Sequence, residues 1–181
     1  MGICRVTADE IQKYMPCSVL TLGAQENIEL VDLKGGSLVS VDIKAHQGTE
    51  RVADLNYPSD LGTYDLVVDC GTVEHCSNIF NAIKNAADAV KVGGRILHHS
   101  PVSMLNHGYF NICPVFYRDY YRLNGWTIER FDLMNMSDEV AKVKMDICAR
   151  NLTIAEWLVL VVALRPEGAT TDRLPLQGEF Q

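Results

Sequence analysis

The chain has 181 residues, of which 48% are hydrophobic and 22% are charged, so it is neither disordered nor fibrous and suits a single folded domain. Its formal net charge of −7 and its pI near 5.1 argue against a nucleic acid or an anionic membrane as the main partner. The longest apolar run, WLVLVVAL, is far shorter than the roughly 20 residues that a membrane helix needs.

Cysteine usage indicates a reducing compartment. The chain has six cysteines, namely Cys4, Cys17, Cys70, Cys76, Cys113 and Cys148. The first residues, MGICRVTADEIQ, do not show the basic start and long apolar stretch of a secretory leader. No C-x-x-C occurs, and no Cys/His pair has zinc-site spacing. We therefore expect reduced thiols in a cytoplasmic protein, in preference to disulfides, and no metal site.

Two short helices are predicted in the first part of the chain. In TADEIQKYM (7–15), Thr7 is followed three positions later by Glu10, which is the capping-box pattern of a helix start. The apolar spacing of NIELVDLK (27–34) predicts a second helix, which the glycine pair at 35–36 would end.

Four apolar runs in the same part of the chain predict strands, because they are rich in β-branched residues and bounded by turn residues. They are SVLTLG (18–23), SLVSVDI (37–43), ERVADL (50–55) and YDLVVDC (64–70).

The second half begins with a longer helical pattern. In SNIFNAIKNAADAVKVGG (77–94) the apolar residues recur at helical spacing, with Ser77 or Asn78 as the cap and Gly93-Gly94 as the end. Later strands are predicted over RILHHSP (95–101), WTIERFDL (126–133) and EWLVLVVALRP (156–166), and a helix or lid over SDEVAKVKMDICARNL (137–152).

Strands that alternate with helical segments predict a doubly wound α/β fold, in which helices cover both faces of a mostly parallel sheet. We expect one domain over residues 1–166 and a loose, polar tail over 167–181. Ligands of such sheets lie beyond the carboxyl ends of the strands. Four predicted strands end there on polar or glycine-containing segments, namely Gly23-Ala24-Gln25, Asp42, Asp54 and Asp69-Cys70-Gly71.

The run YDLVVDCGTVEHCSNIFNAIKNAADAVKVGGRILHHSPV (64–102) resembles the central part of class I S-adenosylmethionine-dependent methyltransferases. In that family a strand of this type is followed by an EH pair, a helix and a glycine pair; here Val92 stands where proline is usual. The segment HGYFNICPVFYRDYYRLNGW (107–126) looks like the aromatic, substrate-side segment of one subgroup. The resemblance implies a Rossmann-like, seven-stranded sheet with a C-terminal antiparallel strand pair.

The resemblance also implies S-adenosylmethionine as the cofactor. Asp42 would accept hydrogen bonds from the ribose hydroxyls, because an ionised carboxylate is an acceptor only. Asp54 and Leu55 would hold the adenine amino group and ring. The backbone of Asp69-Cys70-Gly71 would approach the methionine part of the cofactor.

Each of these acids also has a purely structural explanation. Asp42 can cap the next turn, and Asp69 can cap the loop after its strand. Asp54 precedes Asn56 and Pro58 and can belong to that turn alone.

The loop after the first strand departs from the family pattern. A G-x-G-x-G type loop is expected, whereas TLGAQENIE offers Gly23 and then Ala24 and Gln25. A left-handed backbone at Ala24 or Gln25 would be costly. Either the loop takes a different path, with Gln25 or Glu26 replacing the missing contacts, or cofactor binding is weakened or lost. A nicotinamide site would need G-x-G-x-x-G here, which is absent.

The EH pair supplies the candidate catalytic residues. A sulfonium methyl is already activated, so its transfer needs positioning and, for some acceptors, a base. His75 is the first candidate base, since imidazole titrates near neutral pH, and His107 is the second. Glu74 would orient the imidazole or bind the sulfonium side. The structural alternative makes Glu74 a favourable charge at the start of the following helix and His75 a packing residue.

Other polar and aromatic residues leave alternatives open. His98 and His99 lie on opposite faces of one predicted strand, so one is expected in the core and the other toward the pocket. Six aromatic residues after them either line a substrate site or belong to the ordinary core and surface, namely Tyr109, Phe110, Phe116, Tyr117, Tyr120 and Tyr121.

Two functions follow from these patterns. The first is an S-adenosylmethionine-dependent methyltransferase that acts on a small-molecule acceptor. The second is a non-catalytic protein with a binding or assembly role, which keeps the methyltransferase fold and has lost the glycine-rich cofactor loop. No nucleic-acid or membrane partner is expected, and homo-oligomer formation is left open. No pattern in the sequence identifies the acceptor atom.

Overall fold

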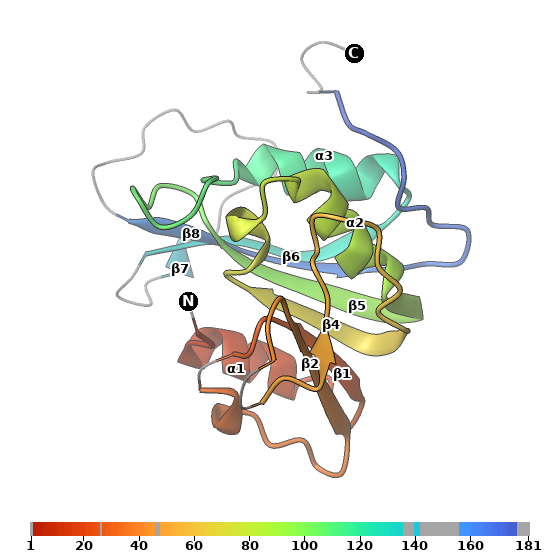
Figure 1. Cartoon of the computed structure of the whole chain (residues 1–181). Helices are drawn as coiled ribbons and strands as arrows, with labels where there is room; N and C mark the ends of the chain where they lie inside the picture. The colour runs from red at the N-terminus through yellow and green to blue at the C-terminus, as the bar shows by residue number, and fades with distance from the viewer. Residues whose placement is uncertain (1, 26, 46–47, 136–139, 142–155, 177–181) are drawn as a thin grey trace.

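A computed structural model describes residues 2–25, 27–45, 48–135, 140–141 and 156–176. Eight strands form one sheet with the order β3-β2-β1-β4-β5-β8-β6-β7 (Figure 1). The strands are β1 Ser18–Leu22, β2 Ser37–Asp42, β3 Arg51–Val52, β4 Tyr64–Cys70, β5 Val90–Pro101, β6 Thr127–Asn135, β7 Val140–Ala141 and β8 Trp157–Leu164. The helices are α1 Arg5–Gln12, α2 Ile79–Asp88 and α3 Pro114–Leu123, with short 3-10 segments η1 Ile28–Leu30 and η2 Val73–His75.

The sheet is parallel in its first five strands and antiparallel at its other end. β1 pairs with β2 and β4, and the pairs β2–β3 and β4–β5 are also parallel. β8 runs antiparallel between β5 and β6, which makes β6 and β8 the expected C-terminal antiparallel pair. The predicted fold class is therefore confirmed, and the short strand β7 adds an eighth member at the edge beside β6.

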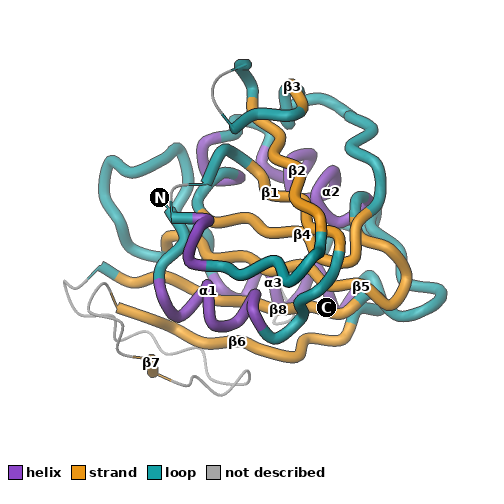
Figure 2. The backbone as a smooth tube through the Cα atoms, turned by 90° about the horizontal axis from the view of Figure 1, so that it is seen from below, coloured by secondary structure: helices purple, strands orange, loops and turns teal. Residues whose placement is uncertain are grey.

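Helices cover both faces of this sheet. Figure 1 shows α2 and α3 on one side of the strands and α1 on the other, and Figure 2 looks onto the sheet from the side of α1. β4 explains why both faces must be covered, because consecutive residues of a strand point to opposite faces. Val67 packs under α2 and α3, whereas Leu66 and Val68 pack with α1. Such a strand reads as a continuous apolar run.

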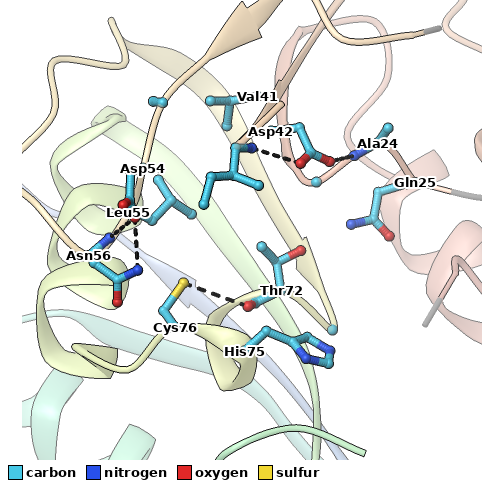
Figure 3. Close-up of a pocket in the computed structure, with 14 residues that line it drawn as sticks. Ala24, Gln25, Val41, Asp42, Asp54, Leu55, Asn56, Thr72, His75 and Cys76 are labelled. Carbon is cyan, nitrogen blue, oxygen red and sulfur yellow. Dashed lines mark hydrogen bonds between the residues drawn. The ribbon is translucent and has the colours of Figure 1, made fainter. Parts of the chain in front are cut away.

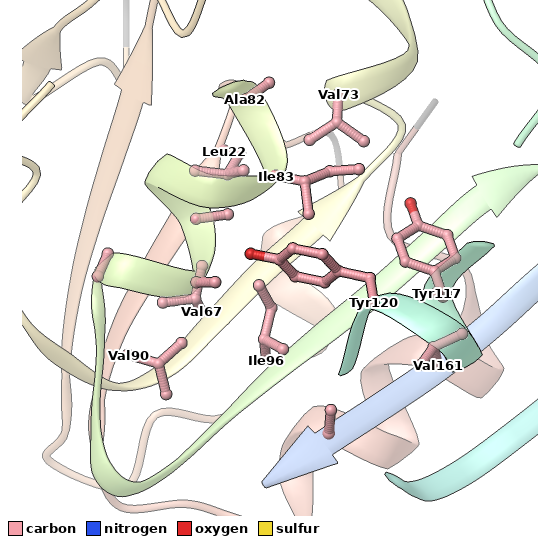
Figure 4. Packing of buried hydrophobic residues seen from close by; sticks show 14 of the residues in the cluster. Leu22, Val67, Val73, Ala82, Ile83, Val90, Ile96, Tyr117, Tyr120 and Val161 are labelled. Atoms are coloured by element: carbon pink, nitrogen blue, oxygen red, sulfur yellow. The ribbon is translucent and has the colours of Figure 1, made fainter. Parts of the chain in front are cut away.

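The larger core lies between the sheet and the helices α2 and α3 (Figure 4). Ala82 and Ile83 of α2 and Tyr117 and Tyr120 of α3 are fully buried against it. α3 lies within the aromatic segment 107–126, for which the sequence pattern predicted no helix. Its tyrosines pack as core residues, which gives the helix its buried face.

The N-terminal helix exists, but its predicted capping box is wrong. α1 begins at Arg5 with Cys4 as the N-cap, and Cys4 forms no side-chain cap bond. Thr7 lies inside the helix, fully buried, with its hydroxyl 3.3 Å from Nδ1 of His99. The Glu10 carboxylate bonds instead to Lys13 and Tyr14. Tertiary contacts use both side chains that the local pattern assigned to the cap.

The glycine pair Gly93-Gly94 does not end the helix that precedes it. α2 begins after Asn78, whose side chain accepts a hydrogen bond from the Asn81 amide, as predicted. It ends at Asp88, however, and Gly93 and Gly94 lie inside β5. A Cβ at Gly94 would lie 2.8 Å from the carbonyl oxygen of Asp65, so close strand packing explains that glycine. The helix predicted over 27–34 is only the 3-10 segment η1.

The segment after β8 is bonded to α3 and its C-terminal turn. The Tyr120 hydroxyl donates to the carbonyl of Thr171 over 2.7 Å, and Trp126 Nε1 donates to the carbonyl of Thr170 over 2.7 Å. Asn124 Nδ2 donates to the carbonyl of Arg173. The expectation of a loose tail from residue 167 is therefore wrong for these residues, and 177–181 lie outside the described part.

Two further expectations concern the segment 137–152 and membrane-spanning helices. Of the helix or lid expected over 137–152, only 140–141 are described, and they form β7. No helix in the described residues is long and apolar enough to cross a membrane.

Candidate functional site

A cavity of about 320 Å³ lies beyond the carboxyl ends of β1, β2 and β4 (Figure 3). Its walls come from four loops: residues 23–25 after β1, 41–43 at the end of β2, 53–56 after β3, and Gly71, Thr72, His75 and Cys76 after β4. Parallel strands bring these loops together because all of their carboxyl ends meet at one edge of the sheet.

The loop after β1 needs few left-handed residues. Gly23 has φ of +75°, and the non-glycine residues with positive φ among those described are Asn27, Lys34 and Asn106. Ala24 and Gln25 therefore avoid the costly conformation, and the loop takes a path of its own. The side-chain amide nitrogen of Gln25 donates to the carbonyl of Leu22 at the end of β1, which stabilises this path.

Thr72 joins that loop to the loop after β4. Its hydroxyl donates to the carbonyl of Leu22 over 2.7 Å, at the end of the neighbouring strand. A Cβ on Gly23 would lie 2.8 Å from the same hydroxyl oxygen. Gly23 is thus required both for its backbone conformation and for this close approach.

Asp42 ends β2 at the wall of the cavity. One carboxylate oxygen accepts the Ala24 amide over 3.1 Å, and the other accepts the Ile43 amide over 2.7 Å (Figure 3). The side chain therefore caps the turn and also holds the loop after β1. A carboxylate has about four lone-pair sites, so these bonds are compatible with the expected contact to a ribose.

The loop after β3 is built by Asp54 and fastened to α2. Asp54 Oδ1 accepts both the backbone amide and the side-chain amide of Asn56, over 2.9 and 2.8 Å, as a turn-forming residue does. The carbonyl of Leu55 accepts hydrogen bonds from Asn81 and Asn85 of α2. Both Asp54 and Leu55 also line the cavity, as expected from the resemblance.

Asp69 and Cys70 are fully buried and are not among the residues that line the cavity. Asp69 Oδ1 accepts the amides of Thr72 and Val73, and Oδ2 lies 2.7 Å from Nδ1 of His98. The Asp69 side chain therefore shapes the loop after β4, in line with the structural alternative. Gly71, with φ of +83°, is the residue of the three that lines the cavity.

The Glu-His pair lies on η2, and its two side chains have opposite environments. His75 is exposed and lines the cavity, whereas Glu74 is fully buried. The loop after β5 packs on Glu74: its carbonyl accepts the amides of Tyr109 and Phe110 over 3.0 and 3.3 Å. The same loop brings His107 close, with Nε2 3.4 Å from Glu74 Oε1.

Burial changes the acidity of these groups. It raises the pKa of Glu74 to about 8, and the negative charge of Asp69 acts in the same direction. Burial also lowers the pKa of His107, with the neighbouring His75 contributing. A carboxyl with a pKa near 8 is largely neutral at pH 7, which argues against Glu74 as a charge that stabilises the helix start. Glu74 lies against His107, not in a hydrogen bond that orients His75.

Comparisons with known proteins give a fold but no sequence match. No protein-family model matches the chain, and no curated protein matches its sequence. TehB from Haemophilus influenzae matches with a TM-score of 0.67 and 16% identity over 90% of this chain. A SAM-dependent methyltransferase from Archaeoglobus fulgidus matches with a TM-score of 0.62 and 15% identity, over 88% of this chain and 91% of that one.

The chain has the class I methyltransferase fold. A further structure with this fold, coclaurine N-methyltransferase bound to N-methylheliamine and SAH, matches with a TM-score of 0.60 and 11% identity over 89% of this chain and 69% of that one. The chain spans 62% of the length of the TehB structure. At these identities the likeness concerns the fold alone.

The expectation that one of the paired histidines faces the pocket of this methyltransferase fold is wrong. His98 and His99 are both buried, and neither lines the cavity. His98 Nε2 lies 2.6 Å from the hydroxyl of Tyr121, which completes a buried chain from Asp69. These buried polar groups are paired with one another, because a buried polar group without a hydrogen-bond partner would cost free energy of folding.

The aromatic residues divide into two sets. Tyr117, Tyr120 and Tyr121 of α3 are fully buried core residues, and Phe116 of the same helix is partly buried against this core, which agrees with the structural alternative for them. Tyr109 and Phe110 lie in the loop that packs on Glu74, and they are 75% and 37% exposed. These two residues are thus the aromatic ones of this group that lie beside the Glu-His pair.

The sequence did not single out several residues of the site. The cavity is also lined by Val41, Ile43, Ala53, Asn56, Thr72 and Cys76. Most of them are neighbours of predicted residues, so proximity along the chain was a usable signal. The contact of Thr72 with Gly23 joins two distant loops and had no local signal.

Proposed function

We propose that the protein binds S-adenosylmethionine in the cavity at the ends of β1, β2 and β4 and transfers its methyl group to a small-molecule acceptor. The observation that carries the proposal is the position of Asp42, at the end of β2 on the cavity wall and bonded to the loop after β1. Ligands of doubly wound sheets lie at this edge. The methyltransferase fold and the SAH in coclaurine N-methyltransferase support the cofactor class.

In this proposal each wall of the cavity contacts a different part of the cofactor. Asp42 accepts the ribose hydroxyls, because a carboxylate can take two donors at once. Asp54 and Leu55 hold the adenine, with Leu55 supplying an apolar surface for the ring. Gly71 and residues 23–25 lie along the methionine part.

The acceptor side lies at η2. His75 lines the cavity, and Glu74 and His107 lie behind it, so these three are the proposed acceptor-side residues. In the transfer, a lone pair of the acceptor forms a bond to the methyl carbon, and the sulfonium–carbon bond breaks to leave S-adenosylhomocysteine. The protein has to hold the two partners in line and exclude water. The assignment of His75 or His107 as a base stays a prediction.

A second candidate is a non-catalytic binding protein with the same fold. The observation that favours it is the loop after β1, where Gly23 is followed by Ala24 and Gln25 and the next element is only the 3-10 segment η1. A decayed loop would leave the fold intact and abolish cofactor binding. Direct binding therefore separates the two candidates.

Calorimetric titration with S-adenosylhomocysteine is the test. We expect wild-type protein to bind one molecule per chain, and Asp42→Ala to bind about 10–150-fold more weakly, as for the loss of hydrogen bonds to a charged group worth about 1.5–3 kcal/mol. Asp42→Asn keeps one acceptor oxygen and should lie between them. The control is Asp9→Ala, which removes an exposed acid of α1 that does not line the cavity.

Thermal unfolding of each variant shows that it is folded before its affinity is compared. A wild-type protein that does not bind S-adenosylhomocysteine at millimolar concentration would contradict the methyltransferase proposal and favour the binding-protein candidate. Equal affinities of Asp42→Ala and wild type would move the ribose contact to another residue.

A further inference from the structure

Three side chains beside the cavity bring ligand-type atoms close together. Glu74 and His75 of η2 and His107 of the loop after β5 each offer one such atom, and all of these atoms lie within 4.8 Å of one another. Both carboxylate oxygens of Glu74 and Nε2 of His107 are buried and have no hydrogen-bond partner among the described residues. Buried polar groups are nearly always paired, so this group needs an explanation.

The spacing within the cluster suits a shared ion better than a direct bond. Glu74 Oε1 and His107 Nε2 are 3.4 Å apart, which is longer than the usual range of a hydrogen bond to nitrogen. Two ligand atoms bound at about 2.0–2.1 Å to a tetrahedral ion lie about 3.3–3.4 Å apart. The distance between Glu74 Oε1 and His107 Nε2 therefore matches that of two ligands of one ion, and a ring nitrogen of His75 lies within 4.8 Å of both groups.

The backbone holds this arrangement in place. The carbonyl of Glu74 accepts the amides of Tyr109 and Phe110, so the loop that carries His107 is fastened to the residue that carries the carboxylate. Gly108 makes the approach possible, because a Cβ there would lie 2.9 Å from Glu74 Cγ and 3.0 Å from its carbonyl oxygen. Fixed ligand positions of this kind favour metal binding, since little order is lost when the ion enters.

We propose that Glu74, His75 and His107 bind a divalent transition-metal ion through one carboxylate oxygen and one nitrogen of each imidazole. Two imidazoles and one carboxylate suit Zn²⁺, Co²⁺ or Fe²⁺ better than Mg²⁺ or Ca²⁺, which prefer oxygen ligands alone. Three protein ligands leave a coordination position for water or for a substrate oxygen. Because His75 also lines the cavity, that position lies beside the proposed cofactor site.

This site departs from the expectation that the chain has no metal site. That expectation used the spacing of Cys and His along the chain, whereas these ligands come from two loops that only the fold brings together. Both buried carboxylate oxygens of Glu74 have no hydrogen-bond partner among the described residues, and a bound cation would give one of them a partner. The inference does not depend on the proposed methyltransferase activity.

Metal binding is tested on the full chain after treatment with a chelator. We expect calorimetry to show one Zn²⁺ per chain, and Co²⁺ to give visible absorption bands without a thiolate charge-transfer band. Glu74→Gln and His107→Gln should each weaken Zn²⁺ binding by roughly 100-fold or more, since even indirect partners of metal ligands cost about 10–100-fold. The matched control is Glu29→Gln, an exposed glutamate of η1.

Thermal unfolding supplies a second readout. Zn²⁺ should raise the melting temperature of wild type and Glu29→Gln but not of Glu74→Gln, because an ion stabilises only the state that binds it. If Glu74→Gln does not fold, His75→Ala serves in its place, since His75 is exposed. No Zn²⁺ uptake at one per chain, unchanged affinity in the variants, or a thiolate band with Co²⁺ would each overturn the metal site.

The same samples separate the two proposals. S-adenosylhomocysteine is titrated with and without Zn²⁺. Cofactor binding by a protein that takes up no Zn²⁺ would overturn the metal site alone. Zn²⁺ uptake by a protein that does not bind the cofactor would overturn the methyltransferase proposal alone.

Discussion

Gly23 is the residue on which the loop after β1 depends. Its φ of +75° is one that residues with a side chain rarely adopt. A Cβ at this position would also lie 2.8 Å from the Thr72 hydroxyl oxygen. That hydroxyl holds the end of β1 by its bond to the Leu22 carbonyl. A single glycine thus serves a loop for which the family pattern supplies several, because Ala24 and Gln25 keep ordinary backbone conformations.

We therefore expect Gly23→Ala to weaken binding of S-adenosylhomocysteine as well as folding. A left-handed alanine costs about 1–2 kcal/mol, and the contact with Thr72 adds to this cost. The matched control is Gly35→Ala, because Gly35 has φ of +86° but nothing lies within 4 Å of its Cβ position. Urea unfolding and cofactor titration of both variants are compared. If the two lose equal stability and equal affinity, the contact with Thr72 has no effect.

At the scale of elements, the strands were the more predictable part. β1, β4 and β8 are mostly buried apolar runs and β2 is a partly buried one, and the bounds of all four agree with the prediction to within one or two residues. The elements that failed depend on distant partners. α3 is helical because its tyrosines pack into the core, and β5 begins early, at Val90, because that residue pairs with Tyr64 of β4.

The segment after β8 makes a testable contribution to stability. Deleting residues 167–181 removes the acceptors of the Tyr120 hydroxyl and of Trp126 Nε1, and the carbonyl of Arg173 that accepts from Asn124. We expect a loss of several kcal/mol in the free energy of unfolding, at about 1–3 kcal/mol for each buried polar group left without a partner. Urea unfolding of wild type and of the truncated chain measures the loss.

The control for that deletion is a chain that ends at Leu176, which keeps all three acceptors. It should unfold close to the wild-type urea concentration. Equal destabilisation of the two truncated chains, or none in the longer deletion, would show that the bonds to α3 do not stabilise the fold.

At the scale of the whole molecule, the place of the site was predictable and its internal contacts were not. Parallel strands bring Asp42, Asp54 and Gly71 to one edge whatever the loops do, so the strand pattern sufficed. The contact of Glu74 with His107 depends on how the loop after β5 folds back, and no periodicity encodes that. The same holds for the burial of Glu74, which sets its pKa and its proposed role.

Thiol reactivity tests the fold and the expected cytoplasmic location together. None of the five described cysteines is in a disulfide, and Cys148 lies outside the described residues. The thiolate is the reactive form, and burial raises the pKa of Cys76 to about 11 and that of Cys70 well above its ordinary value. Cys113 is exposed. In the folded protein we therefore expect Cys113 to react with a thiol reagent much faster than Cys70 and Cys76.

The measurement is a thiol titration without reductant, first on folded and then on denatured protein. Cys113→Ser should remove a fast phase, whereas Cys76→Ser should change only the count after denaturation. Reduced cysteines predict a total of six thiols in the denatured wild type, the number that the chain contains. A total of four or fewer in freshly purified protein would require disulfides, because each bond hides two thiols, and would contradict a reducing compartment. Fast reaction of Cys70 in folded protein would instead contradict the packing of β4 against α1, because that packing is what buries its side chain.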